Sequence, residues 1–103
     1  MQFLKNPIIT HGRLLDAGCA YGDFLHALTK KKLNIELWGV DISRRSIEAA
    51  RTLYQLPRLY GETMKEFILR KNIPQFDAIT FFEVLEHMDD PMGFILQCKS
   101  LLK

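Results

Sequence analysis

Short apolar runs alternate with longer amphipathic segments along the chain. Residues 13–17, 35–40 and 76–82 are rich in aliphatic and aromatic side chains, and we expect each to form a strand. A weaker strand is expected at residues 58–60. Strands that alternate with helices predict an α/β fold with a parallel sheet.

Helix-start signals follow each of these strands. A first helix is expected at residues 23–31, and Ser43 is placed to cap a second one. The T-M-K-E segment at residues 63–66 has the pattern of a capping box for a third helix. Asp90 as N-cap and Pro91 at the first helical position begin the fourth.

Right-handed crossover connections determine the order of the strands. Numbered along the chain, they should lie in the order 3-2-1-4, which gives a Rossmann-like three-layer α/β sandwich. The chain then reverses direction between the first and fourth strands. The carboxyl ends of all four strands should therefore meet around one crevice.

Composition indicates one domain and limits the partners. The chain has 103 residues, 48% hydrophobic and 25% charged, as expected of a single domain over residues 1–103 in which residues 1–12 are a lead-in. A formal net charge of +2 does not favour nucleic acid as a partner. Two distant cysteines, no signal peptide and no apolar run of ~20 residues predict a soluble protein of the cytoplasm with no membrane partner.

A glycine-bearing turn, D-A-G-C-A-Y-G at residues 16–22, follows the first predicted strand and lets backbone approach a ligand closely. Asp41 ends the next strand, where a carboxylate can accept hydrogen bonds from both hydroxyls of a ribose. Ala20 and Asp23 stand where a dinucleotide motif beginning at Gly18 has glycines, and a carboxylate at the helix start repels a pyrophosphate. The pattern therefore favours a ligand with a ribose and a cationic or zwitterionic group but no phosphate.

Residues 16–22 resemble motif I, D-x-G-C-G-x-G, of class I S-adenosylmethionine-dependent methyltransferases, with Ala20 in place of the central glycine. The resemblance continues through G-V-D-I-S at residues 39–43 and G-E at residues 61–62. Residues 83–91 are similar to the E-V-L-E-H-x-x-D-P motif of a small-molecule branch of this family. The resemblance implies S-adenosyl-L-methionine as the cofactor and transfer of its methyl group to a small-molecule acceptor.

The same resemblance implies roles for individual residues. Asp41 would bind the ribose hydroxyls, Gly18 and its neighbours the methionine part, and Glu62 or Thr63 the edge of the adenine. Phe82 and the residue after it would form the floor near the sulfonium. The candidate cofactor-binding residues are Asp16, Gly18, Cys19, Ala20, Gly22, Asp41, Ile42, Glu62, Thr63, Phe82 and Glu83.

His87 is the candidate catalytic residue, as a general base for an acceptor that must lose a proton. An equally good interpretation is that His87 is a loop residue whose side chain forms a hydrogen bond with the backbone. A narrower resemblance to RNA 3′-terminal 2′-O-methyltransferases would make Glu83, Glu86 and His87 ligands of a divalent metal. Such a site needs a further histidine beyond this segment, so no metal is predicted.

Simpler interpretations stay open for three other candidates. Asp16 could accept hydrogen bonds from backbone N–H groups of the turn. Glu62 could be a solvated acid at a helix start, favoured by the helix dipole. Cys19 is most simply a small buried packing residue.

The family typically continues into strands 5 to 7, and the sequence contains no such strands after Lys103. We therefore expect the strand at residues 76–82 to lie at an open edge, with Ile79 and Phe81 partly uncovered, and to pair with another chain. The chain would then form a homodimer, swap a segment or be part of a longer protein. The alternative to an enzyme is a non-catalytic domain that keeps the fold for nucleoside binding or assembly.

Overall fold

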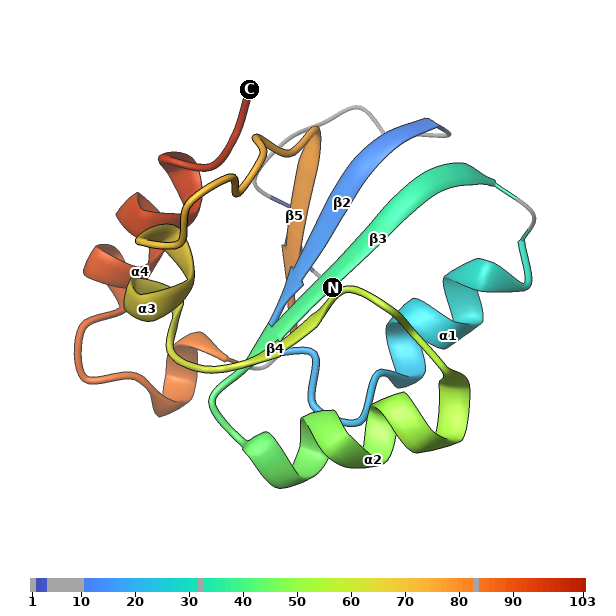
Figure 1. The fold of residues 1–103 in the computed structure, drawn as a ribbon. Coiled ribbons are helices and arrows are strands. Elements are labelled where there is room, and N and C mark those ends of the chain that lie inside the picture. Colours follow the sequence, from blue (N-terminus) through green and yellow to red (C-terminus); the bar gives the residue numbers. More distant parts are fainter. Residues whose placement is uncertain (1, 4–10, 32, 83) are drawn as a thin grey trace.

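The computed structural model describes residues 2–3, 11–31, 33–82 and 84–103, which form a five-stranded sheet between two layers of helices (Figure 1). The strands are β1 (Gln2–Phe3), β2 (His11–Ala17), β3 (Asn34–Asp41), β4 (Leu59–Gly61) and β5 (Ala78–Phe81). The helices are α1 (Asp23–Thr29), α2 (Arg44–Tyr54), α3 (Met64–Ile68) and α4 (Pro91–Lys99), with a 3-10 helix at Leu85–His87. None of the helices so described is long and apolar enough to cross a membrane.

Strand β2 lies at the centre of the parallel part of the sheet. Its Leu15 is opposite Trp38 of β3 on one side and Ile79 of β5 on the other, and both pairings are parallel. Strand β4 continues the sheet beyond β3, also in parallel. The resulting order β4-β3-β2-β5 is the predicted 3-2-1-4 order, so the Rossmann-like architecture is confirmed.

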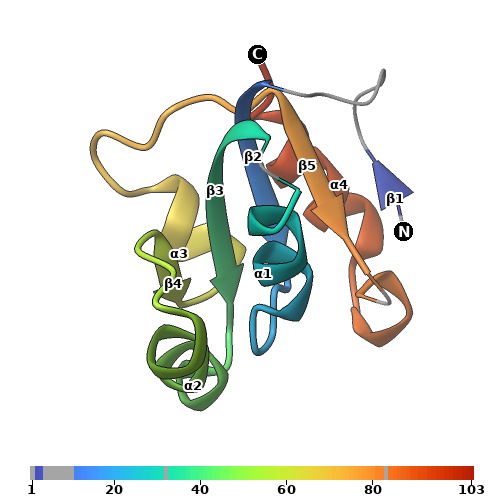
Figure 2. The same cartoon turned by 90° about the vertical axis from the view of Figure 1, so that its right-hand side faces the viewer.

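The edge of the sheet beside β5 differs from the prediction. Strand β1, within the predicted lead-in, pairs antiparallel with β5, with Gln2 opposite Phe81 (Figure 2). Ile79 is 0% exposed and Phe81 only 3%, since α4 covers that face and the ring of Phe94 packs edge-on against Phe81 at 5.8 Å. The expectation that this strand lies at an open, partly uncovered edge is therefore wrong, and the prediction of a homodimer loses that support.

Two hydrophobic clusters fill the space between the sheet and its helices. Leu14 of β2 packs on the α1 and α2 side with Leu25, whereas its neighbour Leu15 packs on the α3 and α4 side with Phe67. Successive strand side chains point to opposite faces, so a strand covered on both faces needs apolar residues at adjacent positions. Leu14 and Leu15 supply such an adjacent pair at the centre of β2.

Capping side chains fix the start of three helices, and two of these helices begin directly after a strand. Ser43 and Asp90 each accept a hydrogen bond from the backbone N–H three residues ahead, at 3.2 and 3.0 Å. Thr63 and Glu66 form the predicted capping box. The connections after β3 and β4 are therefore short, and their residues stay at the carboxyl edge of the sheet.

Candidate functional site

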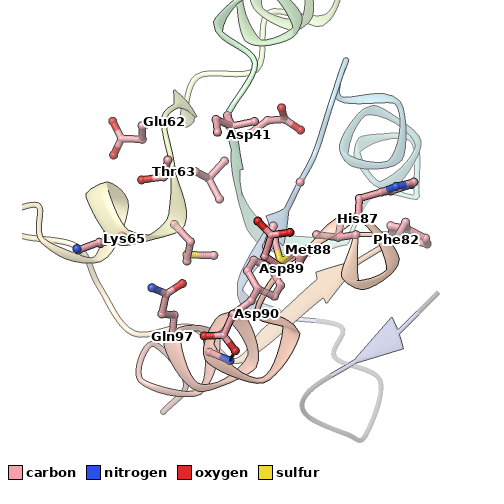
Figure 3. A pocket seen from close by; sticks show the side chains of 18 residues that line it. Asp41, Glu62, Thr63, Lys65, Phe82, His87, Met88, Asp89, Asp90 and Gln97 are labelled. Carbon is pink, nitrogen blue, oxygen red and sulfur yellow. Dashed lines mark hydrogen bonds between the residues drawn. The ribbon is translucent and has the colours of Figure 1, made fainter.

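A cavity of about 730 Å³ lies at the carboxyl ends of the parallel strands (Figure 3). Its wall comes from the glycine turn after β2, the ends of β3 and β4, the start of α3, the loop after β5, and α4. This volume is within the ~300–1,000 Å³ typical of small-molecule sites. Most of the predicted site residues lie on this one wall.

The glycine turn contributes backbone rather than side chains to the cavity. Gly18 lines it with φ +83°, and a Cβ there would lie 2.7 Å from Cγ2 of Val84. The N–H groups of Gly18 and Cys19 both donate to the carbonyl oxygen of Val40, at 2.7 and 3.1 Å. The turn is thus fastened to β3, and only glycine fits at position 18.

Ala20 has a left-handed backbone with φ +51°, a conformation that costs an L residue about 1–2 kcal/mol. Replacing Ala20 with glycine should therefore raise the free energy of unfolding by about 0.5–1 kcal/mol, because part of the relief is offset by glycine's larger chain entropy. Urea denaturation measures this change. Ala27→Gly in α1 is the matched control and should lower stability by about 1 kcal/mol; a loss at both positions would contradict the prediction.

Asp41, the last residue of β3, borders the cavity (Figure 3). Its Oδ2 accepts a hydrogen bond from the N–H of Ala20 at 2.9 Å, and its Oδ1 accepts one from Ser43 at 2.8 Å. These bonds join the glycine turn to the connection between β3 and α2. A carboxylate has about four lone-pair sites, so Asp41 can still accept bonds from hydroxyl groups of a ligand.

Asp16 lies beneath the turn and does not line the cavity. Asp16 is 1% exposed, and its Oδ1 accepts a hydrogen bond from Oγ1 of Thr80 at 2.9 Å. Burial raises the pKa of the Asp16 carboxyl from 3.8 to about 7, the Thr80 hydroxyl opposes this shift, and the charge of Asp41 adds to it. The hydrogen bond that Asp16 accepts comes from the side-chain hydroxyl of Thr80 and not from a backbone N–H of the turn. Contact of Asp16 with a ligand stays a prediction.

Cys19 and Gly22 face the layer of α1 and α2 rather than the cavity. Cys19 is 5% exposed, and burial raises the pKa of its thiol to about 12, which disfavours a nucleophilic thiolate. A Cβ on Gly22, which has φ +82°, would lie 3.1 Å from Leu56 and 3.2 Å from Ala50. Both residues therefore shape the turn by packing beneath it, and their contact with a cofactor stays a prediction.

The ends of β3 and β4 bring Ile42, Glu62 and Thr63 to the cavity together, as the sequence analysis expected of one crevice. Ile42 is 73% exposed, so it presents apolar surface that a flat ring could cover. Glu62 is not the solvated acid of the simpler interpretation, because its side chain is 10% exposed and pairs with Arg70.

The loop after β5 supplies Phe82 and His87 to the cavity wall. The ring of Phe82 packs edge-on against Phe24 with 4.7 Å between centroids. His87 lies beside Phe82 in Figure 3; its side chain is 78% exposed and its Nε2 is 3.9 Å from Oε1 of Glu86. Glu83 lies outside the described residues.

The described ranges contain no group of three histidine, cysteine or acidic side chains arranged to hold a metal. Glu86 and His87, two ligands of the metal-dependent interpretation, have side chains that are 60% and 78% exposed. The general-base role of His87 stays a prediction.

Part of the wall was missed by the sequence analysis. Met88 and Asp89 come from the loop before α4, Gln97 from α4 itself, and Lys65 from α3 (Figure 3). Gln97 follows the core residue Phe94 by three positions, so it lies on the same side of the helix, and this spacing is a signal that could have identified it. Met88 and Asp89 lie in a loop, and no sequence periodicity predicts the course of that loop.

Comparison with known proteins places the whole chain in a protein family. The family described as methyltransferase domain has a model that matches residues 1–103. A ubiquinone biosynthesis O-methyltransferase of Actinobacillus pleuropneumoniae serotype 7 is 33% identical over 98 residues, which cover 88% of this chain and 41% of that enzyme. One from Histophilus somni is 31% identical over 112 residues, which cover 100% of this chain and 46% of that enzyme. The chain spans less than half the length of these relatives.

Solved structures share the fold. The plantazolicin methyltransferase BamL, in complex with a desmethylPZN analogue and SAH, superposes with a TM-score of 0.79 at 22% identity, covering 88% of this chain and 34% of that one. A TehB-like SAM-dependent methyltransferase of Corynebacterium glutamicum gives a TM-score of 0.70 at 20% identity, covering 92% of this chain and 51% of that one. At these identities the likeness establishes the arrangement of strands and helices.

Proposed function

Because this chain belongs to the methyltransferase domain family, we propose that it binds S-adenosyl-L-methionine in the cavity at the carboxyl ends of the strands. We further propose that it acts within an S-adenosylmethionine-dependent methyltransferase whose acceptor is a small molecule. The observation that carries this proposal is the position of Asp41, a carboxylate held at the rim of the cavity by two backbone N–H groups. The SAH bound in structures of similar fold supports it.

The donors and acceptors of the cavity suit this cofactor. Asp41 would accept hydrogen bonds from the ribose hydroxyls, and the exposed side chain of Ile42 would cover a face of the adenine. Glu62 and Thr63 would lie along the adenine edge, and the backbone at Gly18 would approach the methionine part. When bound, the cofactor supplies a methyl group on a sulfonium, whose leaving group is already activated.

The chain's own contribution to such a transfer is to bind and orient, which can lower the barrier by several kcal/mol. His87 is the proposed general base for acceptors that must lose a proton, because it lies on the cavity wall near Phe82. The names of the relatives, ubiquinone biosynthesis O-methyltransferases, support a small-molecule acceptor. A homodimer and a location in the cytoplasm stay predictions.

The proposal is tested by calorimetric titration of the intact chain with S-adenosylhomocysteine and, separately, with NAD⁺. We expect saturable binding of S-adenosylhomocysteine and none of NAD⁺ at the same concentrations, because Asp23 at the start of α1 disfavours a pyrophosphate there. No saturable heat with S-adenosylhomocysteine, or tighter binding of NAD⁺, would contradict it. Binding without methyl transfer to any small acceptor would favour the non-catalytic alternative.

A further inference from the structure

Arg70 clamps a carboxylate of the cavity wall from outside the cavity. Arg70 lies just beyond the end of α3, and Glu62 lies just before its start. The guanidinium Nε donates to Oε2 of Glu62 at 2.7 Å and Nη2 donates to Oε1 at 2.6 Å. Two parallel charge-assisted bonds fix the orientation of a carboxylate as well as its position.

The guanidinium is itself held in place by an aromatic cluster. The Cζ atom of Arg70 lies 4.7 Å from the centroid of the Tyr60 ring. That ring stacks on Trp38 with 5.8 Å between centroids and packs edge-on against Phe67 at 5.2 Å. An arginine that stacks on a ring while it bonds bidentately cannot be replaced by lysine without loss of geometry.

Helix capping does not account for this pair. The capping box at the N-terminus of α3 is formed by Thr63 and Glu66 without Glu62, whose two carboxylate oxygens bond to Arg70 instead. The Glu62 side chain is 10% exposed, against 47% for Arg70, and Glu62 rather than Arg70 lines the cavity. The pair therefore holds a carboxylate at the binding site.

We propose that Arg70 is a positioning residue that keeps the Glu62 carboxylate oriented to recognise an amino group on the purine edge of the bound nucleoside. This inference rests on the proposed function. Each Glu62 oxygen accepts one hydrogen bond from Arg70 and keeps a further lone pair. An ionised carboxylate only accepts hydrogen bonds, so it favours a purine that carries an N–H donor over one that lacks it.

The test compares S-adenosylhomocysteine with its analogue whose purine lacks the 6-amino group, by calorimetry on the intact chain. The wild type should bind the amino-bearing ligand at least about tenfold more tightly, the worth of one charge-assisted hydrogen bond. Arg70→Gln should reduce this preference to about threefold or less by weakening only the amino-bearing ligand, and Arg70→Lys should give an intermediate preference. The matched control is Arg45→Gln on the exposed side of α2, which should leave both affinities unchanged.

Thermal unfolding of each variant shows whether it is folded, and the ratio of the two affinities is a readout that a purely structural role would not change. A wild-type preference that persists in both Arg70 variants would overturn the inference, as would a wild type that binds both ligands equally. Those outcomes leave the proposed function intact. A wild type that binds neither ligand would overturn the proposed function and this inference together.

Discussion

Replacing Asp41 with alanine should weaken binding of S-adenosylhomocysteine by at least about 100-fold. The variant would lose the acceptor that we propose for two ribose hydroxyls, and a hydrogen bond to a charged group is worth about 1.5–3 kcal/mol, where 1.4 kcal/mol is a factor of ten. It also frees the N–H of Ala20 and that of Ser43, which Asp41 holds at 2.9 and 2.8 Å. Calorimetric titration measures the change.

Two controls separate the loss of the ribose contact from loosening of the turn. Glu48→Ala removes an exposed carboxylate of α2 that pairs with Arg51 outside the cavity, and it should leave the affinity unchanged. The 2′-deoxy analogue of S-adenosylhomocysteine should bind the wild type more weakly than the parent ligand, and Asp41→Ala should cost it less affinity than it costs the parent, because its 2′-hydroxyl contact is already absent. If the 2′-hydroxyl contributes equally in both proteins, Asp41 is not its partner.

Much of the fold was predictable because local signals agreed with each other. Ser43, Thr63 and Asp90 cap helices as predicted, and the strands fall within a few residues of their expected bounds. These features depend on neighbours in the sequence, such as the side chain of Thr63 reaching the backbone N–H of Glu66. The strand order followed from the handedness of crossovers, which is a general property of the fold class.

The remaining features depend on contacts between residues distant in the sequence. Strand β1 has two residues, too few for a pattern, and it is held by pairing with β5 far along the chain. Asp16 and Cys19 are in the recognisable motif, yet which members of that motif face the cavity is decided by how the turn packs on Val40. Glu62 and Arg70 are closer in sequence, but they lie on either side of α3, where no helical spacing predicts that they bond to each other.

Between pH 4 and pH 8, the wild type should lose about 2–4 kcal/mol of unfolding free energy relative to an Asp16→Asn variant. Burial raises the pKa of the Asp16 carboxyl in the folded chain from 3.8 to about 7, so the folded state binds more protons than the unfolded state over this interval. Stability falls with pH wherever the folded state binds more protons, by about 1.36 kcal/mol per pH unit at most. The loss should begin near pH 4 and level off above pH 7, and urea denaturation at a series of pH values measures it.

A comparison across pH cancels the constant cost or gain of introducing an amide at this buried position. Asparagine keeps an oxygen that can accept the hydrogen bond that Thr80 now donates to Asp16 at 2.9 Å. Thr80→Val removes the hydroxyl that favours the charged carboxyl, so this variant should go on losing stability at pH values above those at which the wild type levels off. Parallel pH profiles for the wild type and Asp16→Asn would show that Asp16 ionises normally in the folded chain and would contradict the prediction.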